Sequence, residues 1–280
     1  MLKRSRRSVH AHAACVAAAL LAAAAHATFT IVAVDPQSGA VGFAGATCGI
    51  GIEFVPAVVP GHGVVAAQAE TSFIGRDAAR DWIAHGDAAT SVLARLADPS
   101  LYRQTFYHRW FASQPPHLQY GVATLTAADG DAGAYSGADI PRWFGSKIGR
   151  GYAVQGNTLR SAAVVDDAAR AFEVAERDGC ASTLADRLLA ALEAARAAGG
   201  DSRCPAEAPA ISAALIVAER GDSPDAPSIA IVAPRHFSFA EGVWLSIVGY
   251  APKPTDPEPI SAVRAQFDAL HLGANCATRP

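Results

Sequence analysis

The sequence lacks the patterns that would assign it to several common functional classes. No C-x-x-C or H-x-x-x-H spacing occurs, so a zinc site is not indicated. No stretch is basic enough to follow a nucleic-acid backbone. The apolar run at residues 13–25 is shorter than the about 20 residues that cross a bilayer core. We therefore expect no metal, no cofactor, no nucleic-acid partner and no stable membrane anchor.

The first 27 residues have the features of an export signal. The apolar run follows a basic segment that contains Lys3, Arg4, Arg6 and Arg7. The triplet Ala25-His26-Ala27 then supplies small residues at the −3 and −1 positions of a signal-peptidase site. We expect cleavage after Ala27, with cleavage after Ala25 as the alternative, and therefore a periplasmic or secreted protein.

Removal of this leader makes the chain more acidic. The leader carries four of the 23 basic residues and no acidic ones, which leaves 19 basic residues against 26 acidic ones, a net charge of about −7. Residues 28–280 have the length and apolar content of a single domain.

The four cysteines of the mature chain permit two disulfides in an oxidising compartment. Cys180 and Cys204 flank one helical stretch, so we expect them to pair. Cys48 and Cys276 would then form the second bridge.

Strand-like and helix-like segments alternate in groups. Strands are expected at 28–34, 40–47, 63–69, 120–126, 132–137, 151–156, 211–219, 228–233 and 243–250. Helical periodicity covers residues 76–97, broken at Gly86 with Asp87 as the N-cap of the second half. A second helix pair is expected at 161–176 and 182–198, closed by Gly199-Gly200, and a last helix at 260–270. Paired helices between groups of strands argue against a doubly wound parallel sheet and favour an α+β fold: a four-layer α-β-β-α sandwich of two antiparallel sheets flanked by helix pairs.

Thr28 would be the first residue of both the mature chain and its first strand. A hydroxyl is a poor nucleophile unless a base lies beside it, and a terminal residue carries its own amine, which titrates at about 7.7 to 8.0. An N-terminal threonine can therefore supply the attacking oxygen and the general base together. The alternative is an ordinary strand residue that happens to follow the cleavage site.

An N-terminal threonine that opens a strand of such a sandwich resembles the N-terminal-nucleophile (Ntn) hydrolases. The segments TFTIVAVDPQSGAVGFA, GYAVQGNTL, LLAALEAARAAGGD, ISAALIV and DPEPISAVRAQFDALH further resemble the domain-of-unknown-function 1028 family, in order and over nearly all of the mature chain. The resemblance implies the Ntn-like sandwich and places Thr28 on the threonine of the Met-Thr-Phe-Ser-Ile-Val-Ala start that is typical of that family. The substrate of the family is unknown.

Two departures from the related proteins stand out. The segment SRCPAEAPA follows Asp201, where the family continues with a short Arg-Gly-Gln run. Proteasome-type Ntn peptidases use a lysine near the nucleophile, whereas the mature chain has only Lys147 and Lys253. Proteasome-like peptidase activity is therefore not indicated.

Several residues are candidates to assist Thr28. In the segment QAETSFIG, backbone N–H groups near Thr71 and Ser72 would form an oxyanion site at a helix start, and Glu70 would hold the Thr28 ammonium. The alternatives are plain N-caps and a solvated carboxylate. Thr47 lies in the returning strand and is expected to line the same site.

The segment around Asn157 offers a second set of candidates. The Asn157 amide would donate to an oxyanion, with Gln155 beside it, or Asn157 would be a turn residue after Gly156. Asp201 is a candidate partner for the terminal amine, or a loop carboxylate that caps backbone.

These observations predict an exported amidohydrolase that cleaves an amide bond in a small molecule or peptide, with Thr28 as nucleophile and base. The alternative is a catalytically silent periplasmic binding module on the same fold. The aromatic-rich stretch 102–120 fits a substrate lid, a homo-oligomer contact or ordinary loop packing.

Overall fold

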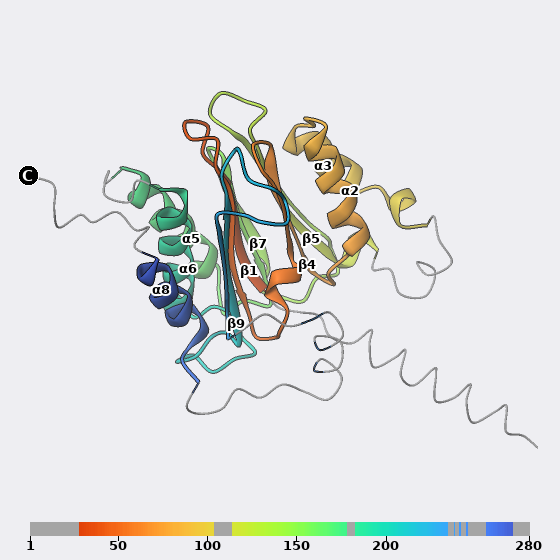
Figure 1. The fold of residues 1–280 in the computed structure, drawn as a ribbon. Helices are drawn as coiled ribbons and strands as arrows, with labels where there is room; N and C mark the ends of the chain where they lie inside the picture. Colours follow the sequence, from red (N-terminus) through yellow and green to blue (C-terminus); the bar gives the residue numbers. More distant parts are fainter. Residues whose placement is uncertain are drawn as a thin grey trace, which may run out of the picture.

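The computed structural model describes residues 28–103, 114–177, 183–234 and 256–270, with the isolated residues 238, 241 and 245. In this part of the chain, two antiparallel β-sheets lie face to face with helices on both outer surfaces (Figure 1).

The larger sheet has six strands in the order β10-β9-β2-β1-β8-β7. Its strands are β1 (Thr28–Val34), β2 (Val41–Thr47), β7 (Gly145–Gly149), β8 (Tyr152–Asn157), β9 (Ser212–Ala218) and β10 (Ile229–Ala233). The smaller sheet has the order β3-β4-β5-β6 and contains β3 (Pro56–Val59), β4 (Gly63–Ala69), β5 (Leu118–Thr124) and β6 (Asp131–Ser136). Every neighbouring pair of strands is antiparallel.

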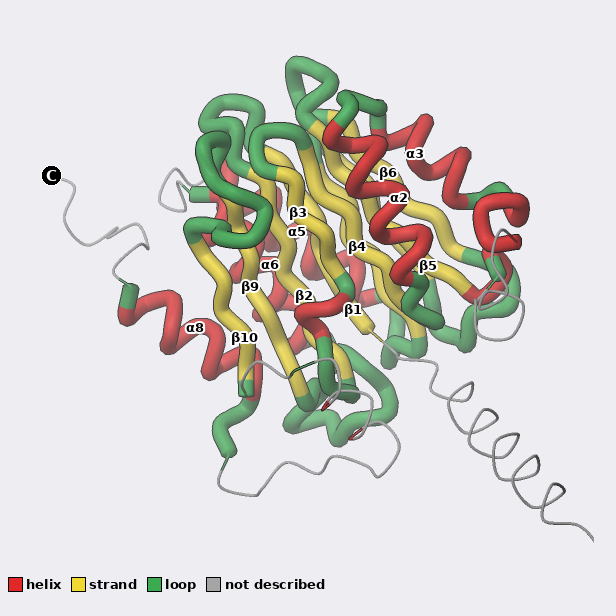
Figure 2. The backbone as a smooth tube through the Cα atoms, turned by 45° about the vertical axis from the view of Figure 1, so that its right-hand side comes forward, coloured by secondary structure: helices red, strands yellow, loops and turns green. Residues whose placement is uncertain are grey.

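Helices cover the outer face of each sheet. The smaller sheet is covered by α2 (Phe73–Ala84) and α3 (Ala89–Leu96), and the larger by α5 (Ala163–Arg177), α6 (Leu184–Ala197) and α8 (Pro259–Ala269) (Figure 2). Short 3₁₀ turns occur at Ile52–Phe54, Pro99–Arg103 and Pro115–His117. The predicted four-layer α-β-β-α sandwich is confirmed.

Strand β1 lies in the middle of the larger sheet, and all seven of its residues are buried. Because side chains alternate across a strand, its two faces enter different cores. Phe29, Ile31 and Ala33 pack with the helices α5, α6 and α8, whereas Val32 and Val34 pack between the sheets. A third core lies between the smaller sheet and α2 and α3. Thr28 and Thr30 share the face of Val32, so the start of β1 points into the layer between the sheets.

The first helix pair differs from the sequence prediction at both helix starts. Helix α2 begins three residues earlier, at Phe73, because the Ser72 side chain accepts a hydrogen bond from Gly75 N and caps it. Asp87 is not the N-cap of α3; that position is Ala88, which has no side chain to cap with. Asp131 supplies the missing acceptor from β6, since its Oδ2 accepts from Ala89 N at 2.8 Å.

The second helix pair follows the prediction closely. Gly199 and Gly200 end it with φ values of 101° and 48°, a backbone geometry that glycine adopts without steric cost. Strands β3 and β7 were not predicted, because one is very short and the other is mostly exposed. The predicted strand at 243–250 lies outside the described residues.

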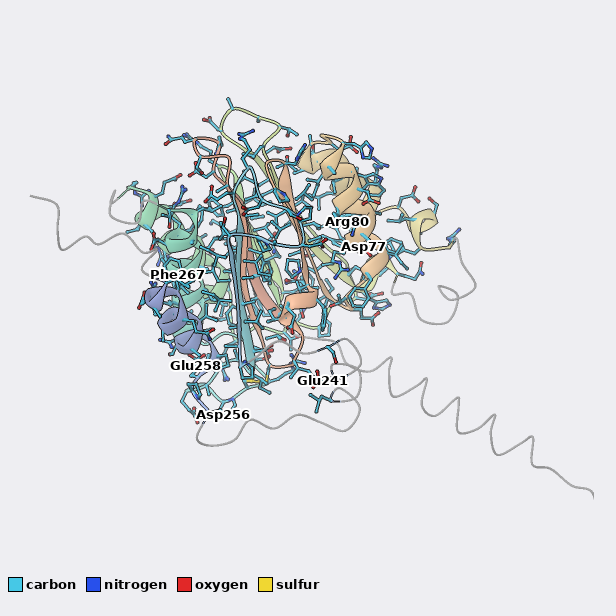
Figure 3. The ribbon with its side chains drawn as sticks, viewed as in Figure 1. Asp77, Arg80, Glu241, Asp256, Glu258 and Phe267 are labelled. Carbon is cyan, nitrogen blue, oxygen red and sulfur yellow. A yellow bond between two sulfur atoms is a disulfide. The ribbon has the colours of Figure 1, made fainter. Side chains whose placement is uncertain are left out.

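The outer surface of α2 is polar. Asp77 and Arg80 are exposed there and form an ion pair one turn apart (Figure 3).

Candidate active site at the start of strand β1

Four polar residues form a row across the larger sheet at the end where β1 begins. The register pairs Thr28 with Asn157 on one side and with Thr47 on the other, and it pairs Thr47 with Ser212. Paired residues share a face of the sheet, and all four are at most 3 % exposed. The row therefore faces the interior between the sheets, where apolar side chains fill the rest of the layer.

The smaller sheet meets this row with two buried glutamines. Gln68 Nε2 donates to the Thr28 carbonyl oxygen at 3.3 Å and to Gln119 Oε1 at 2.7 Å. Gln119 Nε2 donates to Ser136 Oγ at 2.8 Å and to the Gly156 carbonyl at 3.0 Å. The two sheets are thus joined at this end by hydrogen bonds rather than by apolar packing.

Thr30 continues the network one step deeper along β1. Its Oγ1 donates to Gln68 Oε1 at 2.7 Å and accepts from Gln155 Nε2. Gln155 fits between the sheets because residue 121 is a glycine: a Cβ there would lie 2.1 Å from Gln155 Oε1. We name these residues the inter-sheet polar network; its members are Thr28, Thr30, Gln68, Gln119, Ser136, Gln155 and Asn157.

Two oxygens of the network accept no hydrogen bond from the described residues. They are Gln155 Oε1 and Asn157 Oδ1, and both residues are 0 % exposed. The Asn157 amide nitrogen, in contrast, donates to Gln119 Oε1 at 3.2 Å. A buried acceptor without a donor is costly, and native proteins retain few of them, so these two oxygens are the candidate acceptors of the site.

The chain is strained where it leaves the network. Ala69, directly after Gln68, has φ of 69°, and Thr158, directly after Asn157, has φ of 51°. Residues with a Cβ rarely adopt this region, and a β-branched threonine there is an outlier. Residues in such strained conformations persist only where the surrounding contacts hold them, and they are found most often at functional sites.

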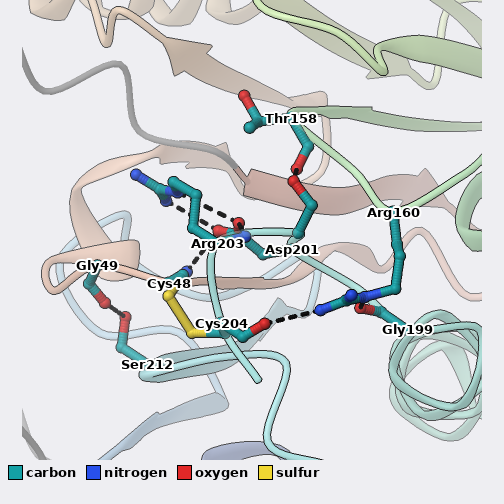
Figure 4. Close-up of a disulfide and its surroundings, with 10 residues drawn as sticks. Cys48, Gly49, Thr158, Arg160, Gly199, Asp201, Arg203, Cys204 and Ser212 are labelled. Atoms are coloured by element: carbon teal, nitrogen blue, oxygen red, sulfur yellow. Dashed lines mark hydrogen bonds and ion pairs between the residues drawn. A yellow bond between two sulfur atoms is a disulfide. The ribbon is translucent and has the colours of Figure 1, made fainter. Parts of the chain in front are cut away.

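A disulfide fixes a loop against the same end of the larger sheet (Figure 4). Cys48 follows β2 and is bonded to Cys204, with Cα atoms 5.7 Å apart. The predicted Cys180–Cys204 pair is therefore wrong, and so is the remaining Cys48–Cys276 pair. The loop after α6 returns to the end of β2 instead of closing on its own helix. Cys180 and Cys276 lie outside the described residues.

Asp201 is fully buried at the start of this loop. Its Oδ2 accepts from Cys48 N at 2.8 Å and from Arg203 Nη2 at 2.8 Å, and its Oδ1 accepts from Arg203 N and Nε. These four bonds match the acceptor capacity of a carboxylate. Ser202 Oγ also donates to the Thr158 carbonyl at 2.8 Å, so the loop is tied to the ends of both β2 and β8.

The predicted segment QAETSFIG lies next to the network, because its first residue, Gln68, is a network member near the end of β4. Glu70 is half-buried, and its backbone N donates to the His117 carbonyl at 3.2 Å. Ser72 is the N-cap of α2, as the simpler reading of the sequence had it. Thr71 is half-buried between them.

Sequence reasoning missed Thr30, Gln68 and Gln119 as site residues. Their signal is a polar side chain at a buried position of an otherwise apolar strand, as in GVVAAQA and LQYGVAT. Gln155 and Asn157 carry the same signal in YAVQGN. Of the two mature lysines, Lys147 lies on the exposed strand β7 and pairs with Asp166 at 3.6 Å, and Lys253 lies outside the described residues.

Among the described residues, no group of three or more His, Cys, Asp or Glu side chains is arranged to hold a metal ion. No helix in the same part of the chain is long and apolar enough to span a bilayer. Most of the aromatic-rich stretch, residues 104–113, lies outside the described residues; within the rest, Tyr102 and Tyr120 are buried under α2 and α3.

Comparison with known proteins gives a family and a fold. The chain is similar to the crystal structure of protein SPO2555 from Silicibacter pomeroyi, described under the family model DUF1028, with 23 % identity and a TM-score of 0.62 over 88 % of this chain and 90 % of that one. At this identity the likeness shows the fold. A search of curated proteins found no match. The model of a family of unknown function, DUF1028, matches residues 28–233, so the chain belongs to the DUF1028 family.

Proposed function

We propose that this protein is an exported amidohydrolase of the Ntn type, in which Thr28 is both nucleophile and general base. The observation that carries the proposal is the place of Thr28: the first residue of the central strand, on the face between the sheets, between Asn157 and Thr47. The family match also begins at residue 28. The Cys48–Cys204 disulfide supports an oxidising compartment and hence export.

In the proposed reaction the Thr28 hydroxyl attacks the carbonyl carbon of an amide, and the Thr28 amine takes the hydroxyl proton. Collapse of the tetrahedral intermediate breaks the C–N bond, and the same proton passes to the leaving nitrogen. An ester on Thr28 Oγ remains, and water hydrolyses it to release the acid.

We take Thr47 as the side-chain donor to the developing oxyanion, because it pairs with Thr28 in the sheet. Asp35 N donates to the Ala40 carbonyl at 2.8 Å, and hydrogen-bonded pairs recur every second residue along β1 and β2. By this alternation Thr28 and Thr47 form a non-hydrogen-bonded pair, the kind in which facing side chains lie closest. Donors aimed at such an oxygen typically contribute about 3 to 4 kcal/mol to the transition state.

Thr28 has a free amine only after the residues that precede it are removed. In the chain with its leader, Thr28 is joined to Ala27 and is 1 % exposed. Cleavage after Ala27 would both create the amine and take away the preceding chain.

An electrophile tests the proposal. The exported protein is incubated with a β-lactone, and peptide mapping by mass spectrometry locates the adduct. We expect one adduct on Thr28 that persists in Thr28→Ser and is lost in Thr28→Ala. An adduct that survives in Thr28→Ala, or labelling of Thr28 only after denaturation, would sink the proposal.

The burial of Thr28 favours a second candidate, a periplasmic binding module that performs no chemistry. In that case the unpartnered oxygens of Gln155 and Asn157 would accept hydrogen bonds from a ligand. A protein that stays unlabelled by the electrophile but gains thermal stability with an amide-rich small molecule would support this candidate.

A further inference from the structure

We infer that Asn157 is the positioning residue for the Thr28 amine, with its Oδ1 as acceptor; this rests on the proposed function. The sequence indicated the opposite role, an amide donor for the oxyanion. The Asn157 amide nitrogen is already used on Gln119, and Oδ1 is the atom left without a partner among the described residues. Asn157 is 0 % exposed, so bulk water does not satisfy that oxygen.

The hydrogen-bond pattern of the sheet turns the nitrogen of Thr28 toward β8. Val34 N donates to the Gly151 carbonyl at 2.8 Å, and in an antiparallel pair such bonds recur every second residue. Thr28 is six residues from Val34, so its nitrogen faces Asn157, its partner in the register, rather than Thr47.

Cleavage after Ala27 supplies the donors that Oδ1 lacks. A backbone amide carries one hydrogen, which the ladder to β8 uses. A free amine carries two hydrogens and its ammonium form three, so at least one is left for a second acceptor on the same side. The unpartnered oxygen therefore matches the group that export trimming creates.

An uncharged acceptor such as Asn157 Oδ1 suits the Thr28 amine, because the amine must be unprotonated to act as a base. Burial lowers the pKa of an amine, whereas a carboxylate beside it raises that pKa and holds it protonated. The charged or titratable groups around this end are Glu70 and His117 near β4, and Asp201 with Arg203 beside β2. Asp201 is already fully bonded to Cys48 N and Arg203. A neutral acceptor at Asn157 adds no such charge, so it opposes the lowering of the amine pKa by burial less than a carboxylate would.

Two substitutions at this position should move the amine pKa in opposite directions. Asn157→Asp places a negative charge beside the ammonium form and raises the pKa by about one unit or more. Asn157→Ala removes a hydrogen bond that favours the ammonium form, so this substitution lowers the amine pKa. Gln155→Glu is the matched control, because it adds a carboxylate on the same face whose partner is Thr30 rather than Thr28, and it should shift the pKa less.

The readout is competitive acetylation of the α-amine between pH 5 and 10 in exported protein, quantified by mass spectrometry of the N-terminal peptide. Lys147 and Lys253 are the only other amines of a chain that begins at Thr28, so the signal is clean. Circular dichroism confirms folding of each variant. If Asn157→Asp does not fold, the test of the Asn157 role is the lower amine pKa that we expect in Asn157→Ala.

The outcomes separate this inference from the proposed function. An amine pKa unchanged in the folded variants overturns the role of Asn157, even if the electrophile labels Thr28. If the amine pKa shifts as expected but the β-lactone does not label Thr28, the role of Asn157 stands and the proposed hydrolase activity is contradicted. A mature chain that does not begin at residue 28 overturns both.

Discussion

Gln119 Nε2 donates a hydrogen bond to the Gly156 carbonyl at 3.0 Å, which joins the two sheets directly beside Asn157. Gln119 Oε1 also accepts from Gln68 and from Asn157. One buried side chain thus holds both the strand that carries Asn157 and the glutamine that bonds to the Thr28 carbonyl. The geometry around Thr28 depends on this residue more than on apolar packing.

Replacing Gln119 with leucine should destabilise the protein. The change leaves the Asn157 amide buried without its acceptor and removes one of the two acceptors of the Gln68 amide, at about 1 to 3 kcal/mol for each unsatisfied group. Urea unfolding followed by circular dichroism measures the loss. Gln37→Leu is the control, since Gln37 is exposed in a turn and its substitution should change stability by less than about 0.5 kcal/mol. Equal stabilities of the two variants would contradict the importance of the network.

Gly121→Ala should displace Gln155. The added Cβ would lie 2.1 Å from Gln155 Oε1, so the amide must move and its bond to Thr30 breaks. Overpacking of this kind typically costs about 1 to 3 kcal/mol. Gly221→Ala is the matched control, because a Cβ there meets nothing within 4 Å. Thermal unfolding compares the two, and a melting temperature of Gly121→Ala equal to that of the control would show that Gln155 has room to move.

Loss of the Cys48–Cys204 disulfide should weaken the folded state. The bridge closes a loop with a sequence separation of 156, for which chain entropy gives about 5 kcal/mol, although measured values are commonly lower. Denaturant unfolding of Cys48→Ser/Cys204→Ser should show a clear loss of stability. A reductant should then destabilise the native protein by more than it destabilises this variant. An identical effect of reductant on both would mean that the bridge does not form.

Stability should fall above about pH 10 because of a buried tyrosine pair. Burial raises the pKa of Tyr102 to about 12, and burial also raises the pKa of Tyr120 well above its ordinary value. The unfolded chain releases these protons near pH 10 and the folded chain holds them, so stability is complete below pH 10 and is lost as pH rises toward 12. Tyr102→Phe should make this alkaline loss smaller by an amount on the order of 2 kcal/mol near pH 12.

The measurement for this pair is a series of urea titrations between pH 8 and 12. At pH 8 the variant should be less stable than the native protein, because the Tyr102 hydroxyl donates to the Leu96 carbonyl at 2.8 Å. Parallel stability curves for the two proteins above pH 10 would contradict the assignment to Tyr102.

The layer order was predictable from the sequence because it follows from periodicity. Strand and helix patterns have different repeats, and the closing glycines at 199 and 200 have a distinct backbone requirement. The start of α3 was not predictable in the same way, since its cap, Asp131, comes from another sheet strand and not from the adjacent Asp87. A local sequence pattern gives no information about a contact of this kind between residues far apart in the chain.

The candidate site was predicted in part for the same reason. Thr28, Asn157 and Gln155 occupy recognisable segments, and the register brings them together. The disulfide partner of Cys204 depended on where the loop after α6 returns, and four cysteines allow three connectivities that sequence spacing does not separate. The acceptor role of Asn157 depended on which of its two polar atoms Gln119 already occupies.

The intact mass of the protein recovered after export shows whether Thr28 has the free amine that the proposed reaction needs. We expect a chain that begins at Thr28, with a free amine on the residue that pairs with Thr47 and Asn157 in the sheet. A mature chain that begins at any other residue, or that keeps Ala27, would contradict it, because Thr28 would then carry no amine to act as the base.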